Sequence, residues 1–185
     1  MGRKCTTATP VPSKKRQVRK NKNVGSSFEI TMLKFFNEYL RKNNIKGICF
    51  RLPDGRRCNQ PVDLLIDSKD FSYAACECKS IYDSALTGGK LYFSKLGNIS
   101  KETHVHQFVK QHNFLLDSER NGMIAFQFRD MKKIFIVPHQ LIYERVLNGE
   151  LYVTVDYIIA NSFDIDDKDA SLKSFVKRKC KTLDD

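Results

Sequence analysis

Apolar residues recur along this chain at two different periods, and the order of these periods predicts the fold class. The first periodic segment runs from Phe28 to Leu40, with apolar residues every three or four positions, as on an amphipathic helix. Ser26 or Ser27 is the expected N-cap, and the helix is expected to end near Asn43. The residues before this helix include almost no large apolar side chains, whereas the residues after it form short apolar runs separated by turn residues.

The later apolar runs predict alternating strands and helices. In chain order we expect strands at 47–52, 62–66 and 71–80, a helix at 102–116, strands at 122–128 and 133–137, a helix at 138–147, a short strand at 151–155 and a terminal turn or short helix at 157–160. If Asp63 faces Glu77 across the hairpin of the second and third strands, then Ile66 faces Ala74 and the turn residues form the loop. This order predicts an α/β fold, in which a mixed central β-sheet is flanked by helices. The stretch 82–100 is less regular, which is typical of a functional or mobile loop.

Charge divides the chain into three parts. The formal net charge is +11, and residues 1–23 carry +8 of it, because they hold eight basic residues and no acid. With so little apolar surface to bury, residues 1–23 are expected to form a disordered basic arm. Residues 24–163 are expected to form one domain, and 164–185 a charged tail in which an acidic stretch precedes a basic one. A basic arm on a globular domain is typical of nucleic-acid binding, although a solubilising tail or a localisation signal has the same composition.

Composition also limits location and metal chemistry. No apolar run approaches the ~20 residues that a bilayer span needs, and the N-terminus lacks the apolar stretch of a signal peptide, so we expect no membrane contact and an intracellular, cytoplasmic location. The six cysteines show no regular framework and are expected to be thiols. Cys49, Cys58, Cys76 and Cys78 lack the paired spacing of a zinc site.

The candidate chemistry lies on the second and third predicted strands. Asp63 is the only polar residue in its strand, and burying it there is costly unless a partner or a metal compensates. Glu77 and Lys79 share one face at the end of the apolar run 71–78, because alternate residues of a strand point the same way. Two carboxylates suit Mg²⁺ or Mn²⁺, and a cation beside that metal equips the site to hydrolyse a phosphodiester. The competing interpretation is that Glu77 and Lys79 are surface charges on an edge strand.

An acid two residues before a lysine is a weak signal by itself. It also occurs at Asp67-Ser-Lys69, Asp130-Met-Lys132 and Asp166-Asp-Lys168, all in predicted turns or polar segments. Only Glu77-Cys-Lys79 ends a buried strand and follows a second strand carboxylate. Three histidines, at 104, 106 and 112, are not spaced for a metal-binding helix, and His106 is expected to be structural or to face DNA. Basic residues near the site in sequence are expected to contact DNA phosphates: Arg51, Arg56, Arg57, Lys90, Lys95 and Lys101.

At these residues the chain resembles the PD-(D/E)xK nuclease superfamily, in which one acid lies in a strand and a second acid and a lysine lie in the next. Over residues 24–145 it is most similar to RecU-like and archaeal Holliday junction resolvases. The segments that carry this likeness are Gly25-Ser-Ser-Phe-Glu29, Pro61-Val-Asp63, Glu77-Cys-Lys79-Ser80, Leu91-Tyr-Phe-Ser-Lys-Leu, His106-Gln107-Phe108 and Gly122-Met-Ile-Ala-Phe-Gln-Phe.

The resemblance implies a restriction-endonuclease-like core and a Mg²⁺-dependent endodeoxyribonuclease that acts as a homodimer on branched DNA in recombination and repair. It implies that Asp63, Glu77 and the backbone carbonyl of Cys78 hold the metal, that Lys79 assists the attacking water, and that Glu29 and Gln107 support the metal or the substrate. RecU proteins carry a long stalk before the first motif acid, whereas only 53–60 is available here. A restriction- or repair-type endonuclease on duplex DNA therefore stays open, as does a non-catalytic nucleic-acid-binding protein.

Overall fold

The computed structural model describes residues 14–53, 61–97, 99, 105–167 and 170–180. The strands are β1 (Ile48–Arg51), β2 (Leu64–Asp67), β3 (Ala74–Ile81), β4 (Lys90–Tyr92), β5 (Gly122–Phe128), β6 (Lys133–Pro138), β7 (Tyr152–Thr154) and β8 (Phe163–Asp164). The helices are α1 (Lys14–Lys42), α2 (Phe93–Leu96), α3 (Gln107–Asp117), α4 (His139–Leu147), α5 (Val155–Ala160) and α6 (Leu172–Lys179), with 3-10 turns at η1 (Lys69–Phe71) and η2 (Asp83–Ala85).

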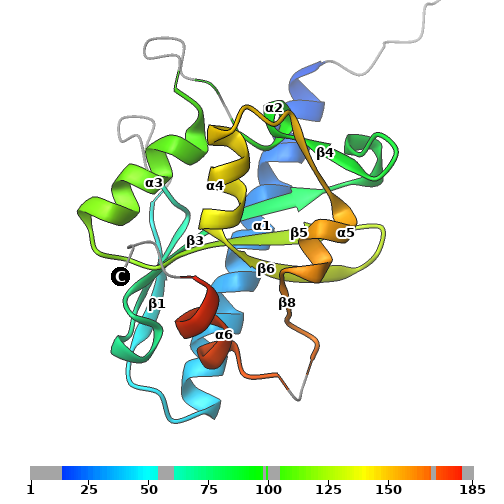
Figure 1. The fold of residues 1–185 in the computed structure, drawn as a ribbon. Helices are drawn as coiled ribbons and strands as arrows, with labels where there is room; N and C mark the ends of the chain where they lie inside the picture. Colours follow the sequence, from blue (N-terminus) through cyan, green and yellow to red (C-terminus); the bar gives the residue numbers. More distant parts are fainter. Residues whose placement is uncertain (1–13, 54–60, 98, 100–104, 168–169, 181–185) are drawn as a thin grey trace, which may run out of the picture.

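Among these residues, six strands form one sheet in the order β1-β2-β3-β5-β6-β8, while β4 and β7 form a separate antiparallel pair (Figure 1). Strands β3 and β5 run parallel, and the other neighbours in the large sheet run antiparallel. The parallel pair is possible because the chain between the two strands crosses over through α3. The expected α/β fold, with helices around a mixed central sheet, is therefore confirmed.

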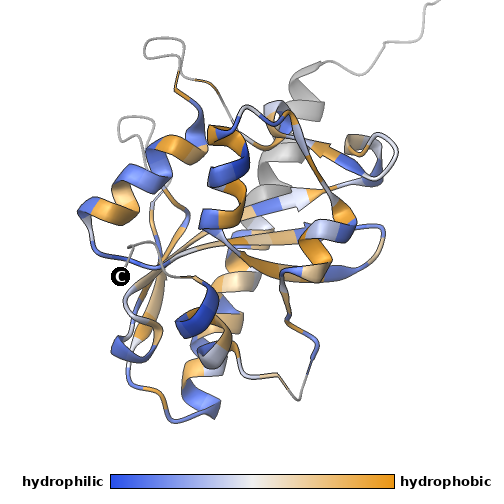
Figure 2. Cartoon of the chain, viewed as in Figure 1, coloured by the Kyte–Doolittle hydropathy of each residue, from blue (hydrophilic) through white to orange (hydrophobic). Residues whose placement is uncertain are grey.

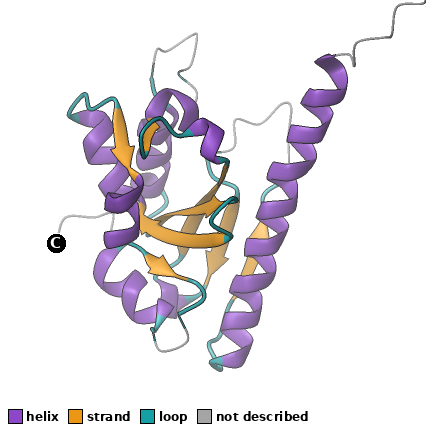
Figure 3. Cartoon of the chain, turned by 90° about the vertical axis from the view of Figure 1, so that its right-hand side faces the viewer, coloured by secondary structure: helices purple, strands orange, loops and turns teal. Residues whose placement is uncertain are grey.

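Two apolar layers hold the sheet between helices. The apolar stripe of α1 packs against one face of the sheet, where Met32 and Phe36 meet Cys76 of β3. Figure 3 shows α1 alone along one side of the strands. On the opposite face Phe108 of α3 joins Phe126 of β5 in a second core that includes residues of α2, α4 and α5. Apolar residues are concentrated on the strands and on the inward sides of the helices (Figure 2).

The hairpin of β2 and β3 has the register that the sequence predicts. Ile66 pairs with Ala74, and the ladder continues to Leu64 and Cys76. Successive residues of β3 alternate between the two faces of the sheet: Cys76 packs in the α1 core and Ile81 in the opposite one. Residues at odd positions on this strand thus point away from α1, which puts Glu77 and Lys79 on the side where α3 begins.

Three expectations about where elements lie are wrong. Helix α1 begins at Lys14 rather than at Ser26 or Ser27, so the last part of the expected arm is helical; residues 1–13 lie outside the described residues. The helix expected at 102–116 begins at Gln107, after the non-helical residues 105 and 106, while 102–104 lie outside the described residues. The irregular stretch 82–100 contains the short elements η2, β4 and α2.

The expectation of a separate C-terminal tail is also wrong for α6, which packs as part of the domain. Leu172 and Val176 are fully buried in the core beneath α1, and the Lys173 ammonium lies 2.6 Å from Asp70 of η1. Although residues 164–185 are mostly polar, Leu172 and Val176 are apolar and four positions apart, so they can dock one face of a short helix. Among the described residues, none of the helices combines the length and the apolar character that a bilayer crossing requires.

The docking of α6 predicts a measurable contribution to stability. We expect Leu172→Ala to lower the free energy of unfolding by about 2–5 kcal/mol, because it removes a fully buried side chain and leaves a cavity. Leu147→Ala is the matched control, since Leu147 ends α4 with 63% of its surface exposed, and its effect is expected to stay within about 0.5 kcal/mol. Urea denaturation measures both. Equal effects of the two substitutions would show that α6 does not pack as described.

Candidate active site

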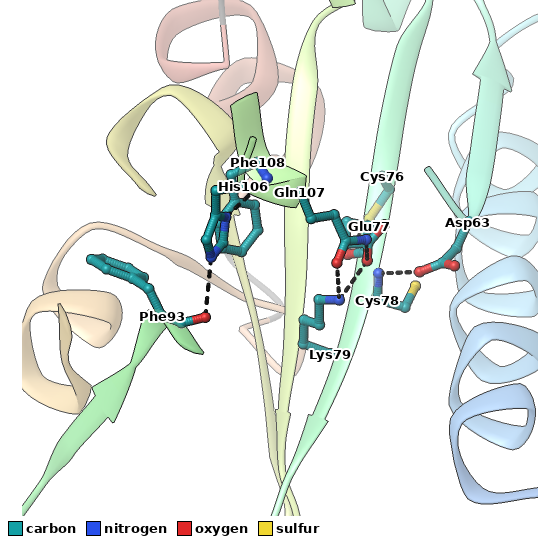
Figure 4. Close-up of polar contacts among 9 residues, drawn as sticks. All are labelled: Asp63, Cys76, Glu77, Cys78, Lys79, Phe93, His106, Gln107 and Phe108. Atoms are coloured by element: carbon teal, nitrogen blue, oxygen red, sulfur yellow. Dashed lines mark hydrogen bonds and ion pairs between the residues drawn. The ribbon is translucent and has the colours of Figure 1, made fainter. Parts of the chain in front are cut away.

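Asp63 is fixed by its backbone on two sides at the point where the β2–β3 ladder ends. Its N–H donates to the carbonyl of Cys76 (3.2 Å), and its carbonyl accepts from the N–H of Leu52, just after β1 (2.9 Å). Its carboxylate Oδ2 accepts from the N–H of Cys78 at 2.7 Å (Figure 4). Asp63 is thus bonded to the residues immediately before and after Glu77, which brings the two acids together as the sequence predicts.

A break in strand geometry makes this arrangement possible. Two residues apart on a regular strand, Val62 and Leu64 would point to the same face. Instead, Leu64 packs in the core beneath α1, whereas Val62 packs with Leu115 of α3. The reversal occurs at Asp63, whose side chain takes the Cys78 amide that a backbone carbonyl would take if the ladder continued.

Glu77, Lys79 and Gln107 form a closed triangle of polar contacts. The Glu77 residue is only 4% exposed, and its Oε1 lies 2.6 Å from the Lys79 ammonium. The Gln107 Nε2 donates to the same oxygen at 3.0 Å, and the Gln107 Oε1 accepts from Lys79 at 3.4 Å (Figure 4). Each group of the triangle restrains the other two, so the lysine is held within reach of both carboxyl-bearing strands.

The start of α3 positions Gln107, and His106 holds that start in place. The His106 Nδ1 caps the helix by accepting from the N–H of Phe108 (3.2 Å), while its Nε2 lies 3.2 Å from the carbonyl of Phe93. These two contacts require a neutral ring with its proton on Nε2. Burial lowers the pKa of His106 and favours that neutral form. His106 is therefore structural, one of the two roles expected for it.

Gly97 leaves the space that Gln107 and His106 occupy. A Cβ at this position would lie 2.8 Å from the His106 Cε1 and 3.2 Å from the Gln107 Cβ. The backbone of Gly97 is extended, so close approach, and not backbone conformation, is what excludes a side chain there. This role was not predicted from the sequence, in which Gly97 directly follows Leu91-Tyr-Phe-Ser-Lys-Leu, a segment of the proposed family motif.

Burial and charge change the acidity of the site. Burial and, after it, the nearby charge of Glu77 raise the pKa of Asp63 to about 7, although the Cys78 amide and the cations of Lys79 and Arg51 act to lower it. Burial also raises the pKa of the Cys78 thiol. The site therefore holds a carboxyl that gains or loses its proton near neutral pH.

Glu29 forms an ion pair with Arg51 beside the site. Its Oε2 lies 2.5 Å from the Arg51 Nε, and the charge of Arg51 in turn lowers the pKa of Asp63. Within the described ranges, no group of three or more His, Cys, Asp or Glu side chains is spaced to hold a metal. The candidate centre is thus two carboxylates with the backbone of Cys78. This donor set fits Mg²⁺, which takes one or two carboxylates and keeps several waters.

The remaining DNA-binding candidates fall into two groups. Lys90 of β4 and Lys95 of α2 lie over tyrosine rings on the β4–β7 pair, 4.4 Å from the Tyr152 centroid and 5.9 Å from that of Tyr92. The tyrosines were not singled out from the sequence, where β4 lay inside an irregular stretch. Arg56, Arg57 and Lys101 lie outside the described residues.

Comparison with known proteins gives no family assignment. No protein-family model matches the chain, and no curated protein matches it in sequence. The resemblance to PD-(D/E)xK nucleases stays a prediction that depends on the motif residues themselves.

The raised pKa of Asp63 predicts a specific pH dependence of stability. Between its ordinary value of 3.8 and about 7, the folded state binds a proton that the unfolded state has lost. Stability contributed by this proton is present at low pH and is lost as the pH rises through 7. We expect the free energy of unfolding of the wild type, relative to Asp63→Asn, to fall by about 2–3 kcal/mol from about pH 5 to about pH 8.

Urea denaturation of both proteins across this range measures the difference. An asparagine at position 63 can still accept the Cys78 amide hydrogen bond, so the comparison isolates the charge. Burial lowers the pKa of His139 and of His106, so these histidines make the free energy of unfolding rise with pH. This effect is expected to be equal in both proteins. Parallel curves for the two proteins would contradict the raised pKa of Asp63.

Proposed function

We propose that this protein is a metal-dependent DNA endonuclease, and that it resembles Holliday junction resolvases in cutting branched DNA. The observation that carries the proposal is the meeting of Asp63 and Glu77 at the end of one hairpin, with the Lys79 ammonium 2.6 Å from Glu77. A buried acid pair with an adjacent lysine is costly for folding, and phosphodiester hydrolysis uses both parts.

The proposed metal is Mg²⁺ or Mn²⁺, held by Asp63, Glu77 and the carbonyl of Cys78. The raised pKa of Asp63 supports this, because burial, and after it the charge of Glu77, makes the ionised Asp63 carboxylate unfavourable here, and a bound cation would offset both effects. When bound, such an ion lowers the pKa of a coordinated water and neutralises charge on the scissile phosphate. Glu29, paired with Arg51, supports the site from α1.

The protein's own groups orient the reaction. The Lys79 ammonium is close enough to Glu77 to donate a hydrogen bond either to the attacking water or to a phosphate oxygen. Gln107 contacts both Glu77 and Lys79, and so keeps the lysine from rotating away between substrates. Holding these groups in one geometry before substrate arrives lowers the entropy lost in reaching the transition state.

The substrate and the assembly follow from charge and from the proposed family. The net charge of +11 suits a polyanion such as DNA. Two symmetric nicks in a four-way junction need two active sites, so we propose a homodimer. The short segment 53–60 favours a second candidate, an endonuclease acting on unbranched duplex DNA, since it is too short for the stalk of RecU proteins.

Cleavage of defined DNA structures tests the proposal. With Mg²⁺ and a synthetic four-way junction, we expect symmetric nicks whose rate falls about 100-fold or more in Asp63→Asn and in Lys79→Ala, because each substitution removes a charge from the site. Linear duplex and flap substrates, run in parallel, separate junction cleavage from duplex cleavage.

The same acid–x–lysine spacing at 67–69 offers matched controls. Asp67 lies four residues beyond Asp63 and pairs with Arg120 (2.7 Å), while Lys69 is exposed on η1. Asp67→Asn and Lys69→Ala are expected to cleave like the wild type. Activity that survives both Asp63→Asn and Lys79→Ala would overturn the assignment, and DNA binding without cleavage in any divalent metal would favour a non-catalytic role.

Metal binding is expected to be measurable without any cleavage. At about pH 8, above the raised pKa of Asp63, saturating Mn²⁺ should raise the melting temperature by about 5 °C or more, because it binds only the folded state. Glu77→Gln should abolish this shift, whereas Asp67→Asn should retain it. A shift that persists in Glu77→Gln would place the metal elsewhere.

A further inference from the structure

The small β4–β7 sheet presents two tyrosines on its outer face. In its register Tyr92 pairs with Tyr152 and Leu91 pairs with Val153. Leu91 and Val153 are buried in the core, so the tyrosines, which alternate with them, lie on the opposite face and are partly exposed. We call Tyr92, Tyr152, Lys90 and Lys95 the tyrosine platform.

The platform combines aromatic and cationic groups. The two rings lie 5.6 Å apart, centroid to centroid, at an interplanar angle of 54°. The Lys90 ammonium lies 4.4 Å from the Tyr152 centroid, and the Lys95 ammonium lies 5.9 Å from that of Tyr92. At its edge, the carboxylate of Glu150 pairs with Arg145. The local charge of the platform is therefore positive, as a polyanionic ligand requires.

A short chain of contacts connects the platform to the candidate active site. Tyr92 directly precedes Phe93, whose carbonyl lies 3.2 Å from the His106 Nε2. His106 in turn precedes Gln107, which contacts Glu77 and Lys79. In Figure 4, Phe93, His106 and Gln107 follow one another in space, and Gln107 lies beside Lys79. A strand of DNA at the site would thus pass close to the end of β4.

We propose that the tyrosine platform binds unpaired nucleotides of DNA next to the cleavage site. Bases stack on aromatic rings only where they are not already stacked within a duplex, and the lysines that lie over these rings are available to contact the phosphates instead. Lysines alone would suit any DNA backbone; the tyrosine pair is what favours a single strand. The inference deepens the proposed nuclease function, because it specifies substrates with a single-stranded or unstacked segment.

A plainer interpretation is that the tyrosines are a cross-strand pair that stabilises a two-stranded sheet. The two interpretations differ in their effect on DNA binding. Binding is measured by fluorescence anisotropy of a fluorescein-labelled oligo(dT) of about a dozen nucleotides, with the full chain in EDTA so that no cleavage occurs. We expect Tyr92→Leu and Tyr152→Leu each to weaken binding about ten-fold or more, and Tyr152→Phe to retain most of the affinity, because it keeps the ring.

Tyr82 provides a matched control elsewhere on the surface. It is 44% exposed, and Arg129 lies over its ring at 4.6 Å, so it has the same pairing of tyrosine and cation outside the platform. Tyr82→Leu is expected to bind oligo(dT) like the wild type. Lys90→Gln should reduce the dependence of log K on log salt by about 0.7, the loss of one contact with a single-stranded phosphate.

The outcomes separate this inference from the proposed nuclease. If the Tyr92 and Tyr152 variants bind oligo(dT) no more weakly than Tyr82→Leu, while circular dichroism shows them folded, the platform is overturned whether or not the protein cleaves DNA. If they lose affinity and Tyr152→Phe retains it, the platform stands, even if no metal supports cleavage. Equal losses in binding of oligo(dT) and of a blunt duplex would also overturn it, since duplex bases cannot stack on the rings.

Discussion

The hydrogen bond from the Cys78 amide to the Asp63 carboxylate is the interaction on which the candidate site depends. It ends the β2–β3 ladder by substituting a side-chain oxygen for a backbone carbonyl, so the Cys78 amide keeps a partner where the strands separate. The same bond carries an acid to the side of Glu77. This one contact thus gives the Cys78 amide a hydrogen-bond partner and brings two carboxylates together.

The cost of this arrangement is electrostatic, and neighbouring groups offset part of it. Burial and the charge of Glu77 oppose ionisation of Asp63, while the Cys78 amide, Lys79 and Arg51 favour it. Glu77 is more deeply buried still and has a direct ion pair with Lys79. Breaking such a pair from one side leaves a buried charge without compensation, which is more costly than the pair itself is stabilising. The network is therefore expected to respond strongly to changes in any of its members.

Sequence reasoning was most reliable where the cause is local. The register of Ile66 on Ala74 followed from placing Asp63 opposite Glu77, which puts the turn residues in the loop, and the shared face of Glu77 and Lys79 followed from the period of a strand. It failed where distant segments meet. Nothing local shows that Leu172 packs beneath α1, that Glu29 pairs with Arg51, or that a side chain on Gly97 would collide with His106. The N-terminal extension of α1 also exceeded what its polar composition indicates.

His106 serves two segments with a single ring, because one nitrogen caps α3 and the other contacts the carbonyl of Phe93. Neither segment can move without costing the other a hydrogen bond. The start of α2, directly after β4, and the first turn of α3 are thereby held together, and this rigidity is established during folding. A ligand arriving at either segment meets a surface that needs no further ordering, so little of its binding energy is lost in ordering the protein.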